Sequence, residues 1–336
     1  MWNKIDIIND TGQKVEAQAP IIISASRSTD IPAFYADWFV ERWKKGYVQW
    51  KNPFNGTYLY VSFKNARMVV FWTKNARPML KHIDFLNKHI KNYYFQFSLN
   101  DYDKEKYEGI VPPLNTRIAT FKELSERIGK NKVIWRFDPL LLTEQIDVQE
   151  LLSRIKNVGD QLRNHTEKLV ISFADIKVYK KVELNLKREH IPFREFTPSS
   201  MNEFAEGLAK LNKEWGFKIG TCAEGIDLIK YGIEQNKCVD DDLIARLFGQ
   251  DRELMKFLGV EIKEPDFFSQ GQTTQKKKNL KDKGQREACG CIISKDIGQY
   301  NTCPHECVYC YANTSKEEAR KNYESSKNNP YNDKIV

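Results

Sequence analysis

The segment Ile21-Ile22-Ile23-Ser24-Ala25-Ser26-Arg27-Ser28-Thr29-Asp30-Ile31-Pro32 contains the pattern on which the fold prediction rests. It begins with β-branched isoleucines, which are typical of a buried strand. Polar residues follow, and Asp30 can cap a helix that carries Pro32 in its first turn and ends at Gly46. The segment therefore predicts one β–α unit.

The same unit recurs about six times before residue 240. Near-continuous apolar strands alternate with helical patterns, which suits a parallel sheet covered on both faces. No glycine-rich dinucleotide fingerprint follows the first strand, so the predicted α/β fold is a partial or complete (β/α) TIM-type barrel rather than an open sheet. The further predicted strands are residues 68–73, 93–98, 133–138, 169–175 and 217–222. A capping box at residues 200–203 predicts the start of the helix before the last of them.

The composition is that of a folded globule, with 336 residues of which 41% are apolar and 29% charged. We expect residues 1–266 to form the barrel, with a hairpin inserted at about 47–63, and residues 289–336 to complete it. The segment 267–288 is rich in lysine and polar residues, which predicts a basic linker. The net charge of +8 permits an anionic partner without demanding one.

The use of cysteine narrows the class of protein. The chain has seven cysteines, an odd number, and five of them fall within the last 48 residues. This clustering predicts a metal site rather than a framework of disulfides. The first residues include no apolar signal segment, and no apolar run approaches the roughly 20 residues of a membrane span. We therefore expect a cytoplasmic protein without a membrane partner.

Three cysteines have a spacing typical of an iron–sulfur loop. Cys303, Cys307 and Cys310 form the pattern C-x-x-x-C-x-x-C. Three thiolates on one short loop can hold three irons of a [4Fe–4S] cluster and leave the fourth iron open to a ligand. A short strand at residues 292–293 and a helix opened by a capping box at residues 314–317 would make the loop part of one more β–α unit.

The sequence also allows other sets of metal ligands. A structural zinc ion would need a fourth ligand, for which His305, Cys291 or Cys289 can serve. Cys291 can equally close an iron cluster. Cys222 can act as a hydrogen-atom donor or as a buried thiol without a role, and Cys238 is read as an ordinary small side chain.

Polar residues at the predicted strand ends are the other candidates for a site, because the carboxyl ends of barrel strands meet at one mouth. Arg27, Lys74 and Arg136 can pair with a carboxylate of a cofactor or substrate. Alternatively, Arg27 can pair with Asp30, and Arg136 with Asp138, as internal salt bridges. The strand-end candidates are Arg27, Asp30, Lys74, Ser98, Arg136, Asp138, Cys222 and Glu224.

The cysteine spacing, the aromatic Tyr309 before the last cysteine and the following Tyr311-Ala312-Asn313 resemble the cluster loop of radical S-adenosylmethionine enzymes, in particular the spore photoproduct lyase group. The whole chain, including SASRSTDIP at 24–32, WRFDP at 135–139 and SKDIG at 294–298, is similar to the domain of unknown function 1848 family. In radical enzymes the loop follows the first barrel strand. The resemblance therefore implies a circularly permuted barrel, in which the last β–α unit takes the first place.

The resemblance also implies cofactors and roles. A [4Fe–4S] cluster would bind S-adenosylmethionine and cleave it reductively to a 5′-deoxyadenosyl radical, which abstracts hydrogen from an unknown substrate. A reducing partner such as flavodoxin or ferredoxin would supply the electron. The implied metal ligands are Cys303, Cys307 and Cys310; the cofactor-binding residues are Tyr309 against adenine, Arg27, Ser98 and Glu224; the catalytic candidates are Arg27, Asp30, Lys74, Arg136, Asp138 and Cys222.

Two other functions fit the sequence. One is an iron–sulfur electron-transfer or sensor protein with a fully ligated cluster. The other is a nucleic-acid modification or repair protein that uses the basic run from Lys276 to Lys283. A nucleic-acid partner is not favoured, because no aromatic residues alternate with the lysines to stack on bases.

Overall fold

A large parallel sheet organises the protein in the computed structural model, which describes residues 2–260 and 279–336. Its eight strands lie in the order β13-β12-β10-β8-β7-β6-β3-β14, and every neighbouring pair is parallel. The strands are β3 (Ile22–Ala25), β6 (Met68–Thr73), β7 (Tyr93–Ser98), β8 (Val133–Leu140), β10 (Lys168–Phe173), β12 (Lys218–Thr221), β13 (Ile233–Gln235) and β14 (Lys295–Asp296). The predicted α/β fold class is confirmed.

The strand order departs from the chain order at one place. From β3 to β13 the strands follow one another as they do along the chain, as expected for successive right-handed β–α units. β14 is the last strand in sequence, yet it pairs with β3, so that Lys295 lies opposite Ile23. The C-terminal segment thus lies beside the first strand of the sheet.

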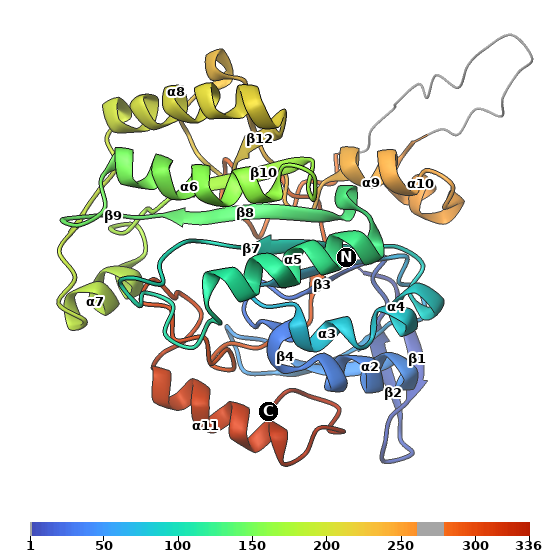
Figure 1. Ribbon diagram of the computed structural model, residues 1–336. Helices are drawn as coiled ribbons and strands as arrows, with labels where there is room; N and C mark the ends of the chain where they lie inside the picture. The colour runs from blue at the N-terminus through green and yellow to red at the C-terminus, as the bar shows by residue number, and fades with distance from the viewer. Residues whose placement is uncertain (1, 261–278) are drawn as a thin grey trace, which may run out of the picture.

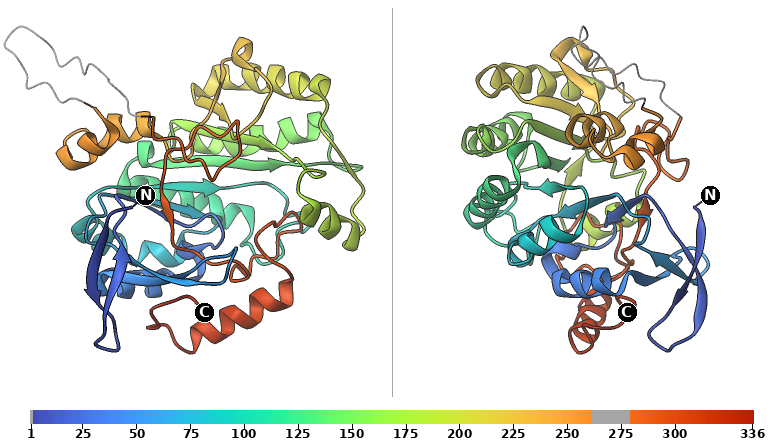
Figure 2. Two further views of the ribbon diagram at one scale, coloured as in Figure 1. Left: turned by 180° about the vertical axis from the view of Figure 1, so that it is seen from behind. Right: turned by 90° about the vertical axis from the view of Figure 1, so that its right-hand side faces the viewer.

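The two faces of the sheet are covered differently, because side chains alternate along each strand. Val69, Phe71, Phe95 and Trp135 point into the main core, under a layer of helices that lies along one side of the sheet (Figures 1 and 2). Among the helices drawn there are α2 (Ala36–Lys45), α5 (Leu114–Ile128), α6 (Val148–Leu162) and α8 (Pro198–Trp215).

The opposite face of the sheet is apolar at one end of the strands and polar near their carboxyl ends. Met68, Val70 and Tyr94 form a second apolar cluster with α9 (Asp241–Phe248) and α10 (Arg252–Leu258). Nearer the carboxyl ends, the buried residues of alternate positions are polar, among them Gln96 and Arg136. Arg136, one of the site candidates, lies at this polar end of the face.

The sheet is curved. The backbone N–H of Ile292, which precedes β14, donates to the carbonyl of Val239, which follows β13, at 3.1 Å. In a flat sheet the two edge strands would be about 34 Å apart, since neighbouring strands are separated by about 4.8 Å. The contact between segments leaving both edges is therefore compatible with a partial α/β barrel.

A second sheet packs beside the first. Its strands β1 (Lys4–Ile8), β2 (Lys14–Gln18), β5 (Tyr58–Ser62) and β4 (Tyr47–Lys51) lie in that order, and β4 pairs with β5 antiparallel within the range where the sequence predicts a hairpin. The sequence did not predict β1 and β2, whose outer residues are largely exposed. The remaining elements are α1 (Ile31–Phe34), α3 (Arg77–Leu80), α4 (Ile83–His89), η1 (Lys130–Lys132), β9 (Leu142–Thr143), α7 (Lys180–Arg188), β11 (Phe193–Arg194), η2 (Ile229–Tyr231) and α11 (Lys316–Lys327).

Local signals at the helix ends were partly correct. Asp30 caps α1 through a bond from the Ala33 N–H at 3.0 Å, and Gly46 ends α2 with a left-handed φ of 82°. The predicted capping box at residues 200–203 is wrong, because Thr197 and Ser200 form the box and α8 begins at Pro198.

Within the described ranges no helix offers a stretch long and apolar enough to cross a bilayer.

Asp296 joins β14 to the end of β3. Its carboxylate accepts bonds from the Ser24 hydroxyl at 2.8 Å, the Ser26 hydroxyl at 2.7 Å and the backbone N–H of Arg27 at 2.8 Å. The backbone N–H of Gly298 also donates to it, at 2.9 Å. Gly298 lies so close to β3 that an added Cβ would fall 1.9 Å from the Ser26 hydroxyl oxygen.

We predict that Gly298→Ala destabilises the protein by about 1–3 kcal/mol, because the new methyl group must push the two segments apart. Gly225→Ala is the matched control, since an added Cβ there meets no atom within 4 Å. Urea unfolding of both variants measures the difference. Equal stability of the two variants would show that the contact between Gly298 and Ser26 is not a constraint on the fold.

Candidate functional site

The three-cysteine loop lies between β14 and α11, at the carboxyl ends of the strands, because it follows a strand that is parallel to β3. Segments after neighbouring strands hold it. The backbone N–H of Val308 donates to the Tyr107 carbonyl at 2.9 Å, and the N–H of Ile110 donates to the His305 carbonyl at 3.0 Å. Cys307 is buried, and Cys303 and Cys310 are partly buried.

Asp30, which follows β3, connects the loop to the residues that follow β6. One carboxylate oxygen accepts from the helix cap at Ala33, and the other accepts from the Lys74 backbone N–H at 2.7 Å. The same oxygen lies 2.7 Å from Nε2 of His305, which is in the loop. Asp30 therefore pairs with His305, and the alternative pair with Arg27 is absent from the ion pairs of the described residues. Asp30 has the contacts of a positioning residue.

A buried charge network surrounds Tyr309. Glu108 accepts from Lys74 Nζ at 2.6 Å and from the Tyr309 hydroxyl, while Arg117 Nη1 lies 3.3 Å from its other oxygen. Asn100 donates to both Glu108 and the Tyr309 oxygen at 3.0 Å. Burial opposes the charge, but Lys74 and Arg117 hold the pKa of Glu108 below its ordinary value.

Glu108, Asn100 and Arg117 were missed by the sequence analysis. Asn100 and Glu108 lie in irregular backbone after β7, where neither strand nor helix periodicity marks a residue. Arg117 lies in α5, where most other buried residues are apolar, so the pattern predicts a helix that only packs on the core. The one available signal was the run of charged residues after a predicted strand end.

The thiols of the loop interact electrostatically. Burial raises the pKa of Cys303 to about 12, and the charges of Asp30 and Cys310 act in the same direction. Burial also raises the pKa of Cys307, which responds to the charges of Cys310 and Cys303. None of the three forms a disulfide.

Arg27 and Arg136 lie over the same indole. Their guanidinium carbons are 5.1 Å and 5.3 Å from the Trp72 ring centre. Arg136 pairs with Asp138, as one of the alternatives proposed, and also donates to Gln96 at 3.3 Å. Nη2 of Arg27 is buried without a hydrogen-bond partner among the described residues. Such an orphaned donor is expensive to bury, so Arg27 stays a candidate for binding a ligand.

The other predicted residues occupy neighbouring strand ends. Glu224 accepts from the Phe173 N–H at 2.9 Å, and burial raises its pKa to about 7, with the charge of Asp175 acting the same way. Ser98 ends β7, in register with Arg136 of β8. Cys222 follows β12, and its Sγ lies 3.5 Å from that of Cys238.

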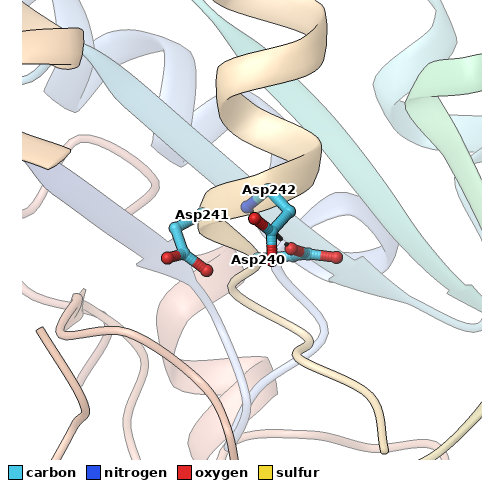
Figure 3. Close-up of side chains that lie close together, drawn as sticks. All are labelled: Asp240, Asp241 and Asp242. Carbon is cyan, nitrogen blue, oxygen red and sulfur yellow. Dashed lines mark hydrogen bonds between the residues drawn. The ribbon is translucent and has the colours of Figure 1, made fainter. Parts of the chain in front are cut away.

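An acidic group lies at the start of α9 (Figure 3). The oxygens of Asp240, Asp241 and Asp242 come within 4.8 Å of one another. Asp240 caps the helix and pairs with Lys168 at 2.9 Å, and Lys237 contacts the other two carboxylates at 2.6 and 2.9 Å. The helix cap and the lysines account for this group, so we assign it no site.

The fold and the site define an α/β protein with a cysteine loop at the carboxyl end of a parallel sheet. A family model described as "Domain of unknown function (DUF1848)" matches residues 22–312, which include the strands of the sheet and the three cysteines. The chain belongs to this family.

Other comparisons add little. No curated protein matches the chain. One solved structure, described as "a putative alpha-L-fucosidase from Bacteroides thetaiotaomicron VPI-5482", is similar at 10% identity and a TM-score of 0.25. The match covers 57% of this chain and 85% of that one. A similarity at this level supports no conclusion about activity.

We predict that Glu108→Gln lowers the free energy of unfolding by about 3 kcal/mol, because Lys74 and Arg117 lose their buried counter-charge. Glu123→Gln is the control, since Glu123 pairs with Arg77 on the surface, where the loss should be at most about 1 kcal/mol. Urea unfolding compares them. Similar losses in both variants would contradict a structural role for the network.

Proposed function

We propose that the chain is a circularly permuted radical S-adenosylmethionine-type enzyme, in which residues 289–336 complete the barrel begun by residues 1–266. The observation that carries this proposal is the position of β14 beside β3. The strand before the cysteine loop is an edge strand, and the other strands follow from it in chain order. This is the place that the first strand and its cluster loop occupy in the enzymes that the loop resembles.

The donor set of the loop fits a [4Fe–4S] cluster. Thiolates are the preferred ligands of such clusters, and Cys303, Cys307 and Cys310 are free. A zinc tetrahedron with Zn–S bonds near 2.3 Å would bring the sulfurs to about 3.8 Å from one another. Within the described part of the chain, only Asp240–Asp242 have three ligand atoms all within 4.8 Å, so the three thiols are more open than zinc requires.

The residues around the loop have distinct roles in this proposal. When bound, the cluster supplies the electron that cleaves the sulfonium of S-adenosylmethionine. Asp30 fixes the loop through His305, and the Glu108 network fixes the ring of Tyr309. The orphaned Nη2 of Arg27 can donate to the carboxylate of the cofactor.

One observation favours a second candidate, a fully ligated cluster with an electron-transfer or sensor role. Nδ1 of His305 is buried without a hydrogen-bond partner among the described residues, and His305 lies between two of the cysteines. This nitrogen can close the fourth corner. Cys291, the fourth ligand considered from the sequence, lies instead against Cys238.

The nucleic-acid alternative gains no support. Lys276, Lys277 and Lys278 lie outside the described residues. Arg286, which follows this run within the predicted linker, pairs with Asp175 at 2.6 Å and donates to the Cys222 carbonyl at 3.3 Å.

Anaerobic protein reconstituted with iron and sulfide should release 5′-deoxyadenosine from S-adenosylmethionine when dithionite is added. Cys307→Ala should release none, and Tyr300→Phe, at an exposed side chain of the loop, should behave as the wild type. Chromatography measures the product, and electron paramagnetic resonance records binding. An intact cluster whose spectrum does not respond to S-adenosylmethionine, with no product, would favour the closed site.

Arg27→Gln should weaken S-adenosylmethionine binding ~10- to 100-fold while the iron content stays constant, because a charged hydrogen bond to the carboxylate is lost. Arg77→Gln is the control at an exposed arginine. Anaerobic calorimetry measures both affinities. An unchanged affinity of Arg27→Gln would remove Arg27 from the cofactor site.

A further inference from the structure

The helix α7 lies directly against the cysteine loop. Nδ2 of Asn185, in this helix, donates to the backbone carbonyl of Cys310 at 3.1 Å. Just before the helix, the ring centre of Tyr179 is 6.1 Å from that of Tyr311, which follows the last cysteine of the loop. In Figure 1, α7 lies on the side to which the arrow of β8 points. One side chain, Asn185, therefore connects the surface of α7 to Cys310.

The segment that contains α7 is basic. Residues 177–190 include five lysine or arginine residues and two glutamates. Both glutamates already pair with lysines, at 2.6 and 2.5 Å. Lys180 and Lys181 take part in no ion pair within the described part of the chain. These two charges are available to a partner with acidic groups.

Apolar side chains are exposed among these charges. Val178 is 71% and Leu184 is 61% exposed. Leu184 follows Lys180 by four residues and Lys181 by three, so the three side chains share one face of the helix. Protein interfaces combine apolar contacts with a polar rim, whereas a nucleic-acid backbone binds mainly through its charge. The composition of this face therefore suits a protein partner.

The other helix beside the loop presents a different surface. The first turn of α11 contains Glu317 and Glu318. Lys316, at the start of the same helix, pairs with Glu189 at 2.5 Å. An acidic partner would be repelled there and attracted on the side of α7. The charges around the loop thus favour one direction of approach.

We propose that α7 and the residues just before it form the docking surface for an acidic flavin-containing electron carrier that reduces the cluster of the loop. The inference rests on the proposed function, in which the cluster needs one electron for each cofactor that it cleaves. The reduced flavin loses one electron and the cluster gains it, and no bond is formed or broken. Val178 and Leu184 suit the apolar dimethylbenzene edge of a flavin. Redox partners meet briefly through small interfaces, for which steering by opposite charges is sufficient.

A comparison of two reductants separates the docking surface from the reaction. Flavodoxin, as the reduced hydroquinone, and dithionite should both reduce the reconstituted wild type. Lys180→Glu/Lys181→Glu should lower the flavodoxin-driven rate about 10- to 100-fold, because the partner is repelled, and leave the dithionite-driven rate unchanged. Lys88→Glu/Lys91→Glu, at exposed lysines before β7 and thus at the amino ends of the strands, is the matched control.

Stopped-flow absorbance measures cluster reduction, and chromatography measures 5′-deoxyadenosine. Equal flavodoxin-driven rates in the wild type and Lys180→Glu/Lys181→Glu would overturn the docking surface. A wild type that is reduced by both donors but releases no product would instead count against the proposed function alone. Acidic residues suit the first turn of a helix, so the variant should fold, and circular dichroism checks this.

Binding of oxidised flavodoxin, measured by calorimetry, does not depend on the reaction. The affinity of the wild type should fall between about 20 and about 300 mM salt, because exposed charges are screened. Leu184→Ala should weaken binding at every salt concentration, since the lost contact is apolar. A wild type that does not bind flavodoxin at low salt would overturn the proposal. Unchanged flavodoxin binding in Lys180→Glu/Lys181→Glu, with loss of duplex DNA binding, would assign the surface to nucleic acid instead.

Discussion

The pairing of β14 with β3 is the contact on which the candidate site depends. Two residues of strand would hold the C-terminal segment weakly, and the carboxylate of Asp296 adds charge-assisted bonds to Ser24, Ser26 and the Arg27 backbone. The same bonds fix the turn from which Arg27 and Asp30 project. One aspartate therefore sets both the register of the loop and the positions of the residues facing it, although some 270 residues separate them.

Buried charge is the second feature that distinguishes the site from the rest of the sheet. Lys74, Glu108 and Arg117 are taken out of water at the same end of the strands, at a desolvation cost that an apolar core would avoid. Lys74 and Asn100 reach Glu108 and the Tyr309 hydroxyl together, so this buried charge fixes the aromatic ring beside the last cysteine of the loop.

The sequence predicted the regular part of the fold well. The segments at 68–73 and 93–98 coincide with β6 and β7, because their long runs of β-branched and aromatic residues leave little ambiguity. The strand expected at residues 292–293 is instead β14 at 295–296, whose lysine and aspartate carry no strand signal and which forms because of its partner. The role of Glu108 and the contact between Cys222 and Cys238 were likewise not predicted, because they depend on which loops the topology brings together. Local propensity finds the strands, whereas long-range pairing creates the site.

The division of the cysteines also separates reactivity from support. A loop that offers three thiolates to a cubic cluster leaves one iron for another ligand. The other group of cysteines, outside the loop, consists of Cys222, Cys238, Cys289 and Cys291. The orphaned Nδ1 of His305 belongs to the loop, whereas the orphaned Nη2 belongs to Arg27, whose charge interacts with Cys291 and Cys238 of the other group. The group of four lies among N–H donors that already point at sulfur. In the proposed function the chemistry belongs to the loop, whereas the four other cysteines lie where the segments that leave both edges of the sheet meet.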